Sequence, residues 1–177
     1  MDKFKNLIVL GPLIYAIHHY EEHIIFNFID WKLQYFQHSA AALSTEAILS
    51  ILTCILVAFA LLHLVKNNRA SAHVILFMLF AIQVINAFYH IFFSFYFSDF
   101  SPGAITAVVL YLPVNFLIVQ AAFKEGYLKS YFEFGCIAFL GTTTFILFEI
   151  FGPIIIVAAI IFSLIYFVWF NKHIGIS

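Results

Sequence analysis

Six apolar runs, each about as long as a helix that crosses a membrane, dominate the chain. The hydrocarbon core of a bilayer is about 30 Å thick and requires roughly 20 helical residues. Because 64% of the residues are hydrophobic and only 10% are charged, a soluble domain is excluded. The sequence predicts an all-α integral membrane protein, a six-transmembrane-helix bundle forming one domain over residues 1–177. The runs are Leu7–Phe28, Ala47–Val65, Val74–Phe97, Ala104–Phe123, Tyr131–Glu149 and Ile154–Phe170.

Basic residues predict how the bundle is oriented, because cytoplasmic loops retain Lys and Arg. With six crossings, Lys32 falls on one side of the membrane. The remaining basic residues fall on the other side: Lys3, Lys5, Lys66, Arg69, Lys124, Lys129 and Lys172. Both termini are therefore expected in the cytoplasm, with the protein multi-pass in the cell membrane. A net charge of −1 and the lack of a basic patch argue for lipid contact and against nucleic-acid binding.

The first run carries an unusual ionisable cluster in the stretch "AIHHYEEHIIF". It consists of His18, His19, Glu21, Glu22 and His23. A charged carboxylate at this depth costs at least about 2.5 kcal/mol on insertion scales, so such groups face the bundle interior and mark a functional site by default. On a helix, Glu22 lies between His18 and His19, and Glu21 flanks the same face. These side chains can converge on one point.

A second polar stripe lies in the third run. Gln83, Asn86 and His90 are spaced i, i+3 and i+7, so they share one helix face. Since the first and third runs cross in the same direction, His90 should lie at a depth close to that of Glu22. We expect the two stripes to meet.

Other ionisable residues have ordinary explanations. Glu46 is expected to cap the second run, where a carboxylate meets the positive end of the helix dipole. Glu149 lies at the outer end of the fifth run and stays ambiguous. The connection Ile29–Glu46, with its aromatic residues, is typical of an interfacial belt and could also cover a site. Four histidines are expected in loops, tails or helix ends: His38, His63, His73 and His173.

His18-His19-Tyr20-Glu21-Glu22 resembles the motif that names the HXXEE family of membrane proteins. That family also has a separate histidine, which His90 matches, and a Tyr-x-Pro-Gly element. Phe100 to Gly103, "FSPG", is similar to this element with phenylalanine in place of tyrosine. The resemblance implies no activity. Pro102 and Gly103 favour a rigid turn that could position the roof of the site.

Imidazoles and carboxylates that converge in a low-dielectric pocket suit a divalent transition metal, zinc more than iron. His18, Glu22 and His90 would be its ligands. Glu21 would be the general base for water on the metal, and Asn86 would orient substrate or polarise a carbonyl. The roles of Glu21 and Glu22 could also be exchanged. Accessory positions are His19, His23, Gln83 and Glu149.

Several reactions fit this set of residues. Our first hypothesis is a metal-dependent hydrolase that acts on a lipid or a lipid-embedded substrate in the outer half of the membrane. A second metal bound by the extra histidines and a bridging carboxylate would instead indicate a di-iron oxidase. A metal-free site looks somewhat like glutamate-type CAAX-processing proteases, but Phe26 occupies the position of the expected arginine. The other classes are a proton- or ion-coupled transporter and a binding protein whose buried polar residues only fix helix register.

Overall fold

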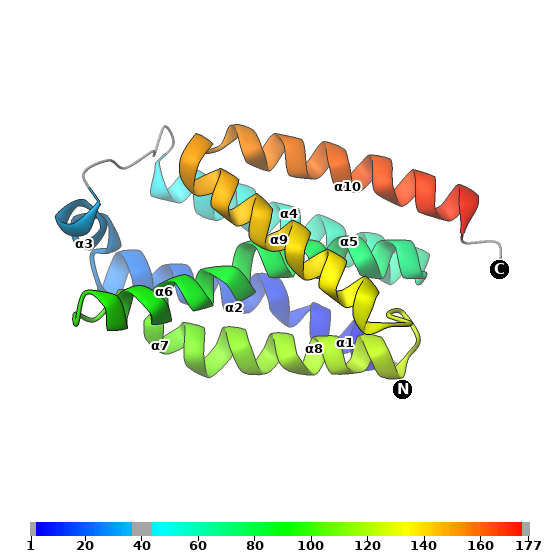
Figure 1. Ribbon diagram of the computed structural model, residues 1–177, viewed down its shortest axis with the longest axis horizontal. Helices are drawn as coiled ribbons and strands as arrows, with labels where there is room; N and C mark the ends of the chain where they lie inside the picture. Colours follow the sequence, from blue (N-terminus) through cyan, green and yellow to red (C-terminus); the bar gives the residue numbers. More distant parts are fainter. Residues whose placement is uncertain (1–2, 37–43, 175–177) are drawn as a thin grey trace.

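The apolar runs fold into helices that lie side by side (Figure 1). The computed structural model describes residues 3–36 and 44–174, which contain helices and no strands. Among the described residues, five continuous helical stretches are long and apolar enough to cross a membrane. They are Thr45–Lys66 (α4), Arg69–Tyr96 (α5, η2 and α6), Ala104–Lys124 (α7, η3 and α8), Tyr131–Phe151 (α9) and Ile154–His173 (α10). The chain is thus a multi-pass membrane protein.

The first apolar run is the one that departs from a single long helix. It forms α1 (Lys3–Ile8), α2 (Leu10–Tyr20) and the π-helix η1 (Glu21–Ile25), with a turn at Val9. The predicted end at Phe28 is wrong, because the backbone becomes extended at Phe26 and Phe28 begins a separate helix. The run is therefore a chain of short segments, and it is not among the five long helices.

That separate helix, α3 (Phe28–Tyr35), forms within the connection that was expected to be an interfacial belt. Asn27 caps it by accepting a hydrogen bond from the Asp30 N–H. Trp31 is buried and its Nε1 donates to Asp99, as does the Tyr35 hydroxyl. The hydrogen bond to Asp99 also raises the pKa of Tyr35. The helix is thereby fastened to the loop that follows α6, whereas His38 and its neighbours lie outside the described residues.

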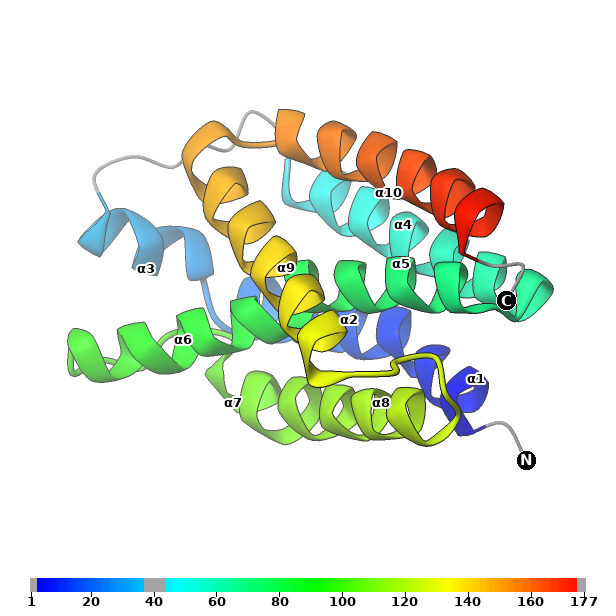
Figure 2. The same cartoon turned by 45° about the vertical axis from the view of Figure 1, so that its right-hand side comes forward.

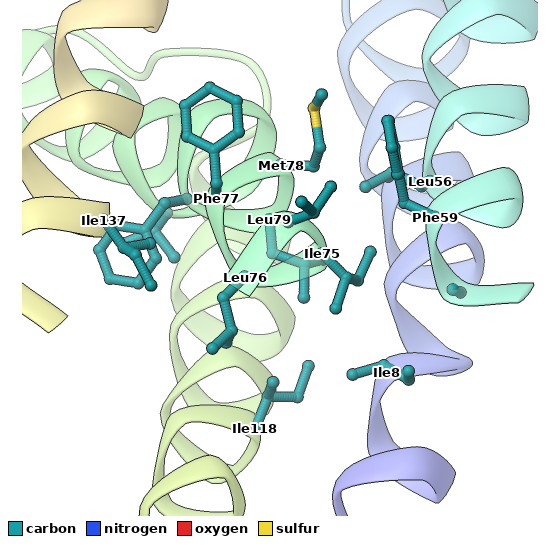
Figure 3. Packing of buried hydrophobic residues seen from close by; sticks show 14 of the residues in the cluster. Ile8, Leu56, Phe59, Ile75, Leu76, Phe77, Met78, Leu79, Ile118 and Ile137 are labelled. Atoms are coloured by element: carbon teal, nitrogen blue, oxygen red, sulfur yellow. The ribbon is translucent and has the colours of Figure 1, made fainter. Parts of the chain in front are cut away.

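The long stretch Arg69–Tyr96 forms the centre of the bundle. Its first part, α5 (Arg69–Leu79), is buried at nearly every position because α4, α8, α9 and α10 all pack against it. Figure 3 shows Ile75, Leu76 and Leu79 among side chains from the neighbouring helices. Gly141 lets α9 approach closely, since a Cβ atom there would lie 2.7 Å from the Phe80 Cβ. The outer helices α9 and α10 expose large apolar side chains, as lipid contact requires.

Three π-helical segments interrupt the regular helices of the described chain. They are η1, η2 (Phe80–Val84) and η3 (Ala107–Tyr111). A π-helical turn inserts one extra residue and so rotates the positions that follow, and such turns are frequent at functional sites. All three segments lie close in sequence to the residues of the site described next.

The ends of the bundle differ in what they carry. In Figures 1 and 2 both chain ends, the α4–α5 loop and the α8–α9 loop lie at one end. The other end, which we call the α3 end, carries α3, the loop between α6 (Ile85–Tyr96) and α7 (Ala104–Thr106), and the α9–α10 junction. The polar cluster of the first run lies toward this α3 end.

Candidate metal centre

The structure brings His18, Glu22 and His90 together in the bundle interior. The Glu22 Oε1 atom lies 3.3 Å from His18 Nε2 and 2.9 Å from His90 Nε2. The three residues are 1%, 7% and 0% exposed, respectively. The expected meeting of the first and third runs is therefore present, and one carboxylate oxygen is its focus.

Hydroxyl groups orient both imidazoles. His18 Nδ1 is hydrogen-bonded to Thr106 Oγ1 at 2.7 Å, and His90 Nδ1 to Ser101 Oγ at 2.9 Å. Because the Thr106 hydroxyl donates its own hydrogen to the Gly103 carbonyl, it accepts from His18 Nδ1–H. In the neutral ring this assignment leaves Nε2 of His18 as the acceptor, which is the nitrogen that faces Glu22. Histidine ligands of metals are commonly held in this way, with the second ring nitrogen fixed by a hydrogen bond.

The two Nε2 atoms are buried and have no hydrogen-bond partner among the described residues, despite their short distances to Glu22 Oε1. Two ring nitrogens and one carboxylate oxygen thus face one another in a largely buried space. A shared cation or proton is needed to stabilise this arrangement.

Glu21 faces the α6–α7 loop rather than this shared point. Its Oε1 accepts hydrogen bonds from the N–H groups of Gly103 and Ile105, and its Oε2 accepts one from Thr106 N–H. Both carboxylate oxygens are therefore bound by backbone donors at the start of α7. The geometry favours a positioning role for Glu21, and its predicted role as a general base stays a prediction.

Gly103 forms the roof of the site. Its φ of +98° is in the left-handed region, and a Cβ atom there would lie within 3.0 Å of atoms in His18, Glu22 and His90. Pro102 beside it is buried. The turn expected from the Pro-Gly pair is thus present directly against the three side chains.

Phe100, the first residue of the "FSPG" stretch, lies differently. Its side chain is 42% exposed and its ring packs edge-on against Phe26, with the centroids 5.0 Å apart. The residue therefore does not reach the three converging side chains.

His19 and His23 form a second group next to the first. Their ring centroids are 4.4 Å apart, and His23 Nε2 lies 3.8 Å from Glu22 Oε2. Glu22 consequently has one oxygen toward His18 and His90, and the other toward His23. The ligand atoms that His19, Glu22 and His23 offer all lie within 4.8 Å of one another.

A cavity of about 490 Å³ adjoins both groups of side chains. His18, His19, Glu22 and His23 contribute to its wall, and most of the remaining lining is apolar. The apolar wall includes Tyr15, Leu52, Met78, Phe145, Phe148 and Ile156. The cavity could hold the hydrocarbon part of an amphipathic molecule next to the polar cluster.

The remaining predicted site residues separate into two groups. Asn86 lines the cavity, and its Oδ1 is buried without a hydrogen-bond partner among the described residues. Glu149 also lines the cavity and pairs with Lys32 at 2.7 Å. Gln83 lies elsewhere, since it donates to the Gly11 carbonyl and accepts from Asn115. Gln83 therefore connects helices and does not reach the cavity.

Sequence reasoning missed four residues that surround the site. Ser101 and Thr106 hold the imidazoles, the Tyr111 ring lies 4.3 Å from that of His18, and the Phe28 ring lies 5.3 Å from that of His90. Ser101 lies inside the quoted "FSPG" stretch, which was a usable signal. No sequence signal indicated Thr106, Tyr111 or Phe28, because their contacts depend on the positions of α3 and η3.

Buried histidines also occur at the opposite end of the bundle. The expectation that His73 lies in a loop is wrong, because it is buried in α5 and hydrogen-bonds to Tyr166 and to the Tyr127 carbonyl. His63 is likewise buried and hydrogen-bonds to Ser71 through Nδ1. Both histidines join helices near the α4–α5 loop.

The comparisons with known proteins identify a sequence family and no activity. A family model described as a protein of unknown function with an HXXEE motif matches residues 9–118, more than half of the chain. This range includes every residue of the converging cluster and the turn above it. No curated protein and no solved structure was found to match the chain.

Two glycines with positive φ test the close packing of the roof. Gly103→Ala should lower the free energy of unfolding by about 1–2 kcal/mol through left-handed strain and by roughly 1–3 kcal/mol more through overpacking. Gly126→Ala should show the strain alone, because its φ is +77° and no atom lies within 4 Å of its added Cβ. Thermal unfolding in detergent measures both. Equal losses in the two variants would contradict the packing of Gly103 against the cluster.

Proposed function

This chain belongs to the HXXEE family, whose function is unknown, and we propose that it is a membrane enzyme whose divalent metal ion is held by His18, Glu22 and His90. The observation that carries the proposal is the meeting of two unpartnered Nε2 atoms and one carboxylate oxygen in a buried space. Two histidines and a carboxylate are a ligand set that leaves coordination positions open for water or substrate.

The surroundings of Glu22 support a bound cation. Glu22 is buried, and its carboxylate has none of the backbone hydrogen bonds that satisfy Glu21. A carboxylate in an apolar bundle is costly, and a cation bound to it would lower that cost. Nitrogen and oxygen ligands suit zinc and also Fe²⁺. We expect zinc, because a closed-shell ion needs no redox partner for hydrolysis.

The protein side chains would hold this centre in three ways. Thr106 and Ser101 orient the imidazoles, and Glu21 fixes the α6–α7 turn above them. Asn86 lines the adjoining cavity, where its side chain would orient substrate. A bound divalent ion lowers the pKa of water that it binds and polarises a carbonyl or phosphoryl oxygen.

The cavity supports a lipid or a lipid-embedded molecule as substrate. An apolar wall beside a polar cluster matches a molecule with a hydrocarbon chain and a hydrolysable polar junction. The surrounding helices expose apolar side chains, so such a molecule would be present at high local concentration. We therefore propose hydrolysis of an ester, amide or phosphoester bond as the reaction.

We also propose six membrane crossings, with α1, α2 and η1 forming the first and with both termini in the cytoplasm. Both chain ends lie at the same end of the bundle, which an even number of crossings requires (Figure 1). The distribution of lysine and arginine favours the cytoplasm for that end. Impermeant labelling of a cysteine added after residue 177 in intact cells should fail, and it should succeed after lysis. Labelling in intact cells would contradict this orientation.

The reaction can be tested before the substrate is identified. Zinc-loaded protein in detergent is incubated with a total membrane lipid extract in H₂¹⁸O, and the products are analysed by mass spectrometry. We expect water-derived ¹⁸O in a released acid or phosphate, and His90→Ala should reduce its formation by about 100-fold or more, because a ligand matters at least as much as an outer-shell residue.

The matched control is His173→Ala, which changes an exposed histidine at the carboxyl end of α10 and should retain the wild-type rate. If the products take up ¹⁸O from ¹⁸O₂ and not from water, the enzyme is an oxidase and not a hydrolase. Absence of product in every sample, combined with Glu22-dependent proton or ion flux in proteoliposomes, would replace it with a transporter.

A further inference from the structure

We infer that His19, His23 and the second carboxylate oxygen of Glu22 bind a second divalent metal ion, so that Glu22 bridges two ions. This inference rests on the proposed function, since it places the second ion next to the ion of His18 and His90. In each set of three residues, the ligand atoms lie within 4.8 Å of one another. Glu22 belongs to both sets.

Both histidines of the second set line the cavity. His19 is 6% exposed and His23 is half-buried, and no described residue is hydrogen-bonded to the ring nitrogens of His19. The imidazoles are therefore available to a ligand inside the cavity. A metal ion between His19 and His23 would give both rings a partner.

The two oxygens of Glu22 already point to different sets. Oε1 lies 2.9 Å from His90 Nε2, and Oε2 lies 3.8 Å from His23 Nε2. A carboxylate that uses one oxygen for each ion is a common bridge in two-metal sites, where the ions lie about 3.5–4 Å apart. The spacing of the two sets on one helix, His18 with Glu22 and His19 with His23, places them side by side.

The second set has better access to substrate than the first. His19 and His23 both line the cavity, whereas His90 is fully buried under Gly103. Glu46 lines the same cavity and adds a carboxylate charge on this side. We therefore assign substrate binding to the ion of the second set. The buried ion would hold the bridging Glu22 in position. Two ions can stabilise both the attacking and the leaving oxygen in a displacement reaction.

Metal counting tests this inference on full-length protein that carries no polyhistidine tag. The protein is saturated with Zn²⁺, passed through a desalting column and analysed for zinc per chain by mass spectrometry of the elements. We expect two ions in the wild type, one in His19→Ala and in His23→Ala, and none in Glu22→Gln, because only Glu22 belongs to both sets. His173→Ala should keep two.

A second measurement detects the coupling between the two ions in the wild-type protein. Wild-type protein loaded with Co²⁺ should bind two equivalents, and the bridge should couple the two ions magnetically, which weakens their electron paramagnetic resonance signal relative to a single-site sample. One ion in the wild type that is lost in His90→Ala but kept in His19→Ala would overturn the second site and leave the proposed function standing. No ion in the wild type would overturn both.

Discussion

Burial of carboxylates among apolar helices is the constraint on which the rest of this structure depends. Glu21 and Glu22 are adjacent in the chain, and both are buried, with exposed fractions of 4% and 7%. The fold solves the problem differently for each. Glu21 is satisfied by backbone N–H groups at the start of α7, and Glu22 is surrounded by imidazoles. Only the environment of Glu22 calls for a further cation.

The architecture around Glu22 consists of deviations from regular helix. The segment η1 carries both glutamates, η2 directly precedes α6 with His90, and η3 begins directly after Thr106. The left-handed Gly103 then lets the loop contact the cluster closely. On the open side, α3 covers the cluster through Phe28 and is held by Asp99. These features interrupt the regular helices, and together they position the polar side chains of His18, Glu22 and His90.

The elements with the strongest apolar signal could be predicted from the sequence. The long helices agree with the predicted runs within a few residues at most ends, and the approach of Glu22 to His90 followed from the cost of polar groups in lipid. The first run was predicted less well, because the turn at Val9 and the π-helical turn at Glu21 leave no mark in hydropathy. The prediction that Gln83 shares a face with His90 assumed a regular helix. The π-helical segment η2 interrupts that helix at Gln83, and the partners of the two side chains lie on different segments.

If His18 and His90 share a metal ion with Glu22, zinc K-edge X-ray absorption of the zinc-loaded protein will detect the imidazoles. We expect nitrogen and oxygen ligands at about 2.0–2.1 Å, with the multiple scattering of two imidazole rings for each zinc. In His19→Ala, where only the site of His18, Glu22 and His90 is expected to keep its ion, this scattering should remain, and it should weaken when His90→Ala is added. A zinc shell without imidazole scattering, or a His19→Ala spectrum that His90→Ala leaves unchanged, would contradict the shared metal ion.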